Sequence, residues 1–113
     1  MTDGTNDRGA FPDFVRALPV YEGRFAANRL AAEGCDVLFA TYPAGTAIEE
    51  HHHDTRNWGV ITKGALYLTV EGEERRYGPG DWYTVAANLP HSARFEEETA
   101  EIEFWFLPDR MAS

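Results

Sequence analysis

Residues 45–64 read GTAIEEHHHDTRNWGVITKG, and this stretch holds three of the four histidines of the chain. His51 and His53 are two residues apart, so in a β-strand their side chains would point to the same face. Asn57 follows four residues later with the same parity, and His91 lies far along the chain. Two imidazoles on one face of a strand can hold a divalent ion, so the sequence predicts a metal site.

The spacing around this histidine pair forms a recognisable motif. Gly45 is followed by five residues, His51 and His53 with one residue between them, three residues, Asn57, six residues and Gly64. This pattern resembles the first motif of the cupin family at every spacing. One residue departs from it, because Asn57 stands where the family has a glutamate.

A second stretch resembles the second cupin motif. Gly80 is followed by five residues, Ala86, one residue, Asn88, two residues, His91, three residues and Phe95. The spacing holds, but Ala86, Asn88 and Phe95 replace the family's proline, glycine and asparagine. Asparagine at a glycine position is reasonable, since both residues tolerate a positive φ.

The resemblance implies an all-β fold, a single cupin-type jelly-roll barrel of the double-stranded β-helix kind. Short strands separated by glycine turns favour the same architecture. We expect residues 1–9 to be a disordered tail, because they are polar, and residues 10–113 to form one barrel domain. The expected strands are Arg24–Glu33, Asp36–Tyr42, Trp58–Thr62, Ala65–Val70, Glu73–Tyr77, Asp81–Val85, His91–Phe95 and Glu101–Leu107.

Composition restricts the possible partners of the chain. With 113 residues the chain is the size of one domain, and its net charge of −9 would repel nucleic acid and anionic membranes. Cys35 is the only cysteine, which excludes an intramolecular disulfide and fits a reducing cytoplasm. We find no apolar leader and no long apolar run, so we expect a cytoplasmic protein.

The resemblance implies that His51, His53 and His91 are metal ligands, with Asn57 as a weak auxiliary. Three neutral imidazoles suit Fe, Mn, Ni or Zn, and the residues do not decide among these ions. Asn57 either ligates weakly or hydrogen-bonds a bound water, and a site that has lost its fourth ligand and its chemistry is the competing interpretation. His52 has the opposite parity, so we expect it to lie in solvent or to pair with an acid such as Glu50.

We expect the ligand pocket at the barrel mouth, where small molecules bind in such folds. Ile102, Phe104 and Phe106 share one face of a strand, which we expect to be core, with part of it lining the mouth. The tryptophans are more typical of core or dimer contacts than of ligand platforms. Arg56, Arg75, Arg76 and Arg94 are candidates to steer an anion, although exposed arginines are usually solvated. The expected pocket residues are Ile61, Phe95, Phe104 and Phe106.

Two classes of function remain open. In the first, the protein is an enzyme acting on a small polar or anionic molecule, by oxygenase-type or lyase/isomerase chemistry at the metal. In the second, it is a binding or sensing module without turnover. A polar general base near the metal would favour the enzyme, and a dry apolar mouth would favour the binding module. Exposed strand edges and the apolar residues within Phe11–Val20 also predict a two-fold homodimer.

Overall fold

The structure of the chain is a computed structural model that describes residues 11–21 and 26–106. The tail expected at residues 1–9 therefore lies outside the described residues. The elements are α1 (Asp13–Arg16), β1 (Ala26–Ala32), β2 (Cys35–Tyr42), β3 (Ala47–His51), β4 (Asn57–Lys63), β5 (Leu66–Val70), β6 (Glu73–Tyr77), β7 (Trp82–Val85), β8 (His91–Arg94) and β9 (Thr99–Phe106).

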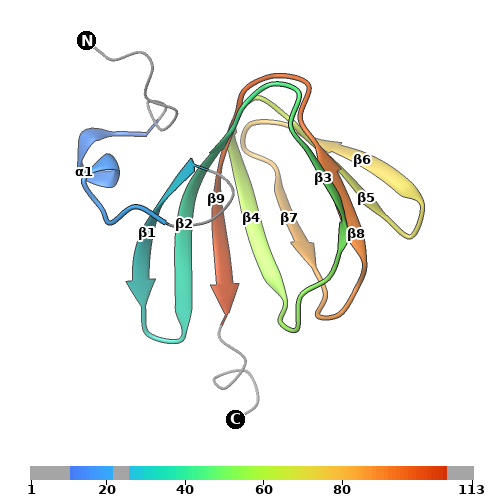
Figure 1. The fold of residues 1–113 in the computed structure, drawn as a ribbon, viewed down its shortest axis with the longest axis horizontal. Coiled ribbons are helices and arrows are strands. Elements are labelled where there is room, and N and C mark those ends of the chain that lie inside the picture. The colour runs from blue at the N-terminus through green and yellow to red at the C-terminus, as the bar shows by residue number, and fades with distance from the viewer. Residues whose placement is uncertain (1–10, 22–25, 107–113) are drawn as a thin grey trace.

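These strands form two antiparallel sheets that face each other (Figure 1). One sheet has the order β1-β2-β9-β4-β7 and the other has the order β3-β8-β5-β6. Neighbours in space are mostly distant in sequence, as β9 between β2 and β4 shows, which is typical of a jelly roll. The expected all-β fold and jelly-roll class are confirmed. The short helix α1 was not predicted, and it is the only helix in the described part of the chain.

The core lies between the two sheets and is built from alternating strand positions. The turn between β4 and β5 requires a glycine. Gly64 has a φ of +79°, and a Cβ there would lie 2.4 Å from the carbonyl oxygen of Glu98. The buried residues of this core are Ala27, Leu38, Ala40, Tyr42, Ile61, Leu66, Leu68, Tyr83, Val85 and Phe95.

A smaller apolar cluster covers the outer face of the five-stranded sheet. Phe11 and Val15, from the segment around α1, are buried against Phe39, Ala100 and Ile102. The apolar residues before the first strand therefore pack partly within their own chain. The helix α1 has only four residues, and no helix in the described ranges is long and apolar enough to cross a membrane.

Candidate metal centre

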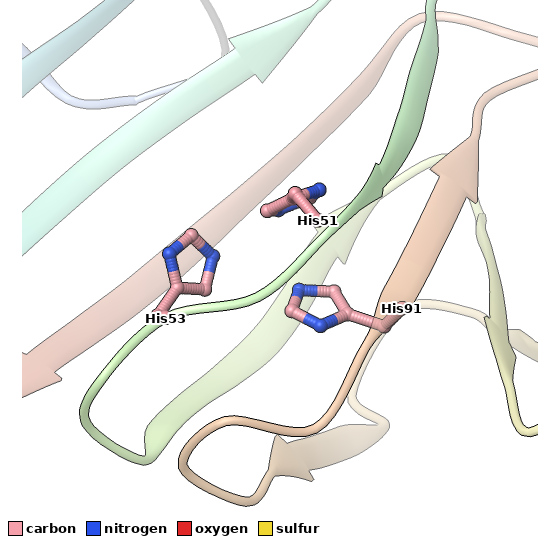
Figure 2. Close-up of side chains that lie close together, drawn as sticks. All are labelled: His51, His53 and His91. Atoms are coloured by element: carbon pink, nitrogen blue, oxygen red, sulfur yellow. The ribbon is translucent and has the colours of Figure 1, made fainter.

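Three histidines meet at one point between the sheets, as Figure 2 shows. His51, His53 and His91 each offer a ring nitrogen, and these nitrogens all lie within 4.8 Å of one another. The ring centroids are 4.7 Å apart for His51 and His53, 4.4 Å for His51 and His91, and 5.2 Å for His53 and His91. The spacing of the two sequence motifs thus brings together the three imidazoles that it singled out.

The backbone brings these histidines together in a different way from the one expected. His51 is the last residue of β3 and pairs directly with His91, the first residue of β8. His53 lies beyond the strand in the loop toward β4, so the two are not neighbours on one continuous strand face. The carbonyl of His53 accepts a 2.6 Å hydrogen bond from the amide of Asn88, whose φ is +63°. That bond fixes the loop, and the positive φ expected of Asn88 is confirmed.

Backbone carbonyls orient two of the imidazole rings. Nδ1 of His51 lies 2.7 Å from the carbonyl oxygen of Glu49, and Nδ1 of His91 lies 2.9 Å from that of Leu89. A carbonyl only accepts, so each Nδ1 carries the proton and each Nε2 keeps a lone pair for a metal. Burial lowers the pKa of His91, which favours the neutral form that binds metals. The ring of His53 instead meets the ring of Trp105 edge-on, at 4.6 Å.

Asn57 opens β4 beside this cluster and lines the same cavity. Its side chain is buried, and among the described residues no donor reaches its Oδ1. An unpaired buried oxygen costs about 1–3 kcal/mol, so a cation or a water in the cavity would stabilise it. The donor set of three neutral imidazoles and one amide oxygen therefore fits a divalent transition metal.

A cavity of about 370 Å³ adjoins the histidines. Apolar side chains from both sheets form part of its wall, including Leu38, Leu66, Leu68 and Val85. The rest of its lining is polar and includes the three histidines, Asn57 and several acids and tyrosines. Its size suits a small molecule of a few carbon atoms beside a metal ion.

Of the four residues expected to line the pocket, Phe95 lines the cavity, and Ile61, Phe104 and Phe106 do not. Phe95 lines the cavity and stacks on Tyr42 at 4.3 Å, whereas Ile61 is buried in the core without lining it. Phe104 lies on the opposite face of β9, where it stacks on Trp82, and Phe106 has the same strand parity. The face assignment of β9 from sequence was therefore wrong.

The inward face of β9 carries two acids and a tryptophan: Glu101, Glu103 and Trp105. The Glu103 carboxylate accepts a 2.5 Å hydrogen bond from the Tyr42 hydroxyl and a 2.9 Å bond from the Trp105 indole. The Glu101 carboxyl accepts one from the Tyr83 hydroxyl. Desolvation raises the pKa of Glu103, and desolvation together with the Glu103 charge raises that of Glu101 further.

A model of the cupin domain family matches residues 38–107, which is more than half of the chain. The chain belongs to the cupin family. None of the curated proteins compared with this cupin matches it. Solved structures with similar folds include an RmlC-like cupin from Shewanella frigidimarina, with a TM-score of 0.72 and 14% identity, covering 85% of this chain and 90% of that one.

Two further structures similar to this cupin have more specific names. KdgF from a Halomonas species has a TM-score of 0.68 and 22% identity, over 89% of this chain and 97% of that one. The DMSP lyase DddQ from Ruegeria pomeroyi has a TM-score of 0.66 and 23% identity, over 83% of this chain and 54% of that one. At these identities the likeness shows a common fold.

Sequence reasoning about this cupin missed its acids. Glu101 and Glu103 alternate with apolar residues, a pattern that usually marks acids on a solvent face. One observation could have found the two acids. The apolar residues that alternate with them, such as Ile102, can also be buried on the outer face of a sheet if another segment covers that face. The candidate arginines are not in the cavity lining: Arg56 bonds Thr84 on the surface, and Arg94 pairs with Glu74 and Glu96.

Proposed function

We propose that this cupin is a metal-dependent enzyme that moves a proton on a small polar molecule, as a lyase or an isomerase. The metal would be a divalent Fe, Mn, Ni or Zn ion held by His51, His53 and His91, with Asn57 as an auxiliary. The observation that carries the proposal is that the metal-ligand cluster and two buried carboxyl groups line one cavity of about 370 Å³. Such a cavity can hold one small molecule against both.

The histidine cluster and the two buried carboxyl groups would have different roles in the reaction. A bound divalent ion would supply Lewis acidity at a carbonyl or carboxylate oxygen of the ligand, which makes a neighbouring C–H bond more acidic. Glu101 and Glu103 supply groups that can exchange a proton in the same cavity. The apolar side chains, Phe95 among them, exclude water from the reacting atoms.

The polar lining of the cavity favours a lyase or an isomerase over a binding module and over an oxygenase. A binding or sensing module requires no proton-transfer groups, and a dry apolar mouth would have supported it. Oxygenase-type chemistry needs metal and oxygen but no buried acid–base groups. The DMSP lyase of Ruegeria pomeroyi is a lyase with the same fold, so the architecture is compatible with the reaction class.

Proton exchange in heavy water tests the proposal. The purified protein, loaded in turn with Fe, Mn, Ni and Zn, is incubated with a panel of small 2-oxo and 3-oxo carboxylates. Nuclear magnetic resonance then follows the loss of C–H signals adjacent to the carbonyl. We expect exchange that requires the metal, is lost in His51→Ala and is kept in His52→Ala, because His52 is exposed. Tight binding without exchange or turnover of any ligand would instead favour the binding module.

A two-fold homodimer and a cytoplasmic location stay predictions. Phe11 and Val15 are buried within the chain, but Phe14 is 76% exposed and Trp82 on the outer sheet face is 56% exposed. These apolar surfaces are available to a second copy of the chain. Light scattering across a dilution series should give twice the 12.7 kDa mass, and a constant mass of 12.7 kDa would refute the dimer.

A further inference from the structure

Glu101 and Glu103 are adjacent on one face of β9, and only 2% and 3% of their surfaces are exposed. Both carboxyl groups line the same cavity, and each accepts a hydrogen bond from a buried tyrosine. We propose that the two carboxyl groups share a single proton and act as one acid–base unit, with Glu103 as the base and Glu101 as the acid. This assignment rests on the proposed function where it concerns the ligand, but not where it concerns the proton.

The hydrogen-bond donors around each carboxyl decide how the proton is divided. Glu103 accepts hydrogen bonds from two donors, the Trp105 indole N–H, which can only donate, and the Tyr42 hydroxyl. A carboxyl group that accepts from two such donors is stabilised as the carboxylate. Within residues 11–21 and 26–106, Glu101 accepts from Tyr83 alone, through Oε1, so its other oxygen can carry the proton toward Glu103.

The alternatives with two protons or none are less stable. Two adjacent carboxylates at this depth would repel each other and would both be desolvated. Two protonated carboxyls would forfeit the charge-assisted bonds that Tyr42 and Trp105 make to Glu103. One proton between the pair keeps the hydrogen bonds from Tyr42, Tyr83 and Trp105, and a shared proton of this kind gives paired carboxyls separate acid and base roles.

The pair lies close to the metal ligands. Trp105 donates to Glu103 and at the same time meets the ring of His53 at 4.6 Å. One side chain thus separates the pair from the histidine cluster. A ligand bound to both sides would present its reacting carbon within the cavity that Glu101 and Glu103 line.

The proton steps balance within the pair. The Glu103 carboxylate would take the proton of a C–H bond next to a carbonyl of the ligand, and the electron pair of that bond would form a C=C bond. A divalent ion held by His51, His53 and His91 would supply Lewis acidity at that carbonyl. Glu101 then gives its own proton to the neighbouring atom of the ligand in an isomerisation, or to the leaving group in an elimination. The proton on Glu103 moves across the shared hydrogen bond to Glu101, which restores the starting state without any added reactant.

The ring of Tyr83 packs against the backbone of a glycine, Gly59, which has no side chain to exclude it. A Cβ at Gly59 on β4 would lie 2.4 Å from the ring of Tyr83, so only glycine leaves room for this phenol against the sheet. The phenol in turn donates to Glu101. Gly59 is therefore a positioning residue for the acid of the pair.

Infrared spectroscopy of the metal-free, full-length protein tests the shared proton directly. At neutral pH we expect the C=O stretch of one buried protonated carboxyl group in the wild type. Glu101→Gln should lose it, because Glu103 keeps the Tyr42 and Trp105 donors that stabilise its charge. Glu103→Gln should keep it, because Glu101 carries the proton and stays buried. Glu98→Gln is the matched control, since Glu98 is exposed and pairs with Lys63 at 3.0 Å. It should leave the band unchanged.

Every other result contradicts the proposal. Absence of the band in the wild type would mean that both acids are ionised, and a band that survives in Glu101→Gln would mean that Glu103 carries a proton. If the glutamine variants fail to fold, Tyr83→Phe keeps both carboxyls and should shift the band, because Tyr83 bonds Glu101. An unshifted band in that variant would overturn the assignment of the proton to Glu101.

Restoring the metal separates this inference from the proposed function. Glu103→Gln should bind metal as the wild type does and lower the exchange rate about 10²–10⁴-fold, the range typical of a general base. A confirmed shared proton with no exchange in the wild type would refute the proposed function alone. Exchange that is unchanged in Glu103→Gln would refute the catalytic role of the pair alone.

Discussion

The two polar walls of the cavity are built in opposite ways. The histidine wall is held by backbone, since carbonyls of Glu49 and Leu89 orient His51 and His91 at the paired ends of β3 and β8. The acid wall is held by side chains, through the bonds of the Glu101–Glu103 pair to two tyrosines and a tryptophan. The first arrangement leaves Nε2 of His51 and His91 available to a ligand, whereas the second gives the tyrosine and indole donors their acceptors. We therefore expect changes in the histidines to alter binding and changes in the acids to alter stability.

The largest expected effect is the loss of stability in Glu103→Ala. This change leaves the Tyr42 hydroxyl and the Trp105 indole N–H without their acceptor inside the protein. Each unpaired donor costs about 1–3 kcal/mol, so the free energy of unfolding should fall by roughly 2–6 kcal/mol. Urea unfolding measures it, with Glu98→Ala as the control, since an exposed ion pair contributes about 0–1 kcal/mol. Equal losses in both variants would refute the contrast between the walls.

The second effect is the loss of metal affinity in His91→Ala. Loss of a ligand's supporting partner alone lowers metal affinity about 10–100-fold, and loss of the ligand itself should cost at least as much. Metal analysis after dialysis and titration with Zn measure this, and His52→Ala should match the wild type. The unfolding free energy of the metal-free His91→Ala protein should fall by less than that of Glu103→Ala. The reverse order would contradict the comparison.

The sequence predicted one wall and missed the other for a physical reason. The histidines were recognisable because they stand at the spacings of two cupin motifs, and both motifs are kept in the sequence. Glu101 and Glu103 are buried only because Tyr42, Tyr83 and Trp105 come from three different strands to bond them. No local pattern reports such partners, so the apolar residues of β9 were assigned to the inside. Phe11 and Val15 in turn cover the outer face of the sheet, where Ile102 packs against them.

The pH dependence of stability gives the third effect. The pKa values of Glu101 and Glu103 are raised above the ordinary 4.5, so the folded state retains a proton that the unfolded state releases. The stabilisation is complete below pH 4.5 and is lost as the pH rises through the folded pKa. One retained proton gives a fall of at most about 1.4 kcal/mol per pH unit. Glu101→Gln should remove this slope, and a slope equal to that of the wild type would show that the pair is not its source.

The smallest expected effect concerns Asn57, where the two walls meet at the start of β4. Asn57→Glu would place a carboxylate where an amide oxygen is buried without a partner. A carboxylate is a harder and stronger ligand, and it also cancels part of the positive charge of the ion. We therefore expect divalent metal to bind a few-fold tighter and a small carboxylate such as propionate to bind the metal-loaded protein a few-fold more weakly. Calorimetric titration of both proteins with Zn and then with propionate would measure the two changes. Asn57→Asp is the matched control, because its shorter side chain adds the same charge with less reach toward the histidines. Equal propionate affinity in all three proteins would show that the charge of the site does not govern anion binding.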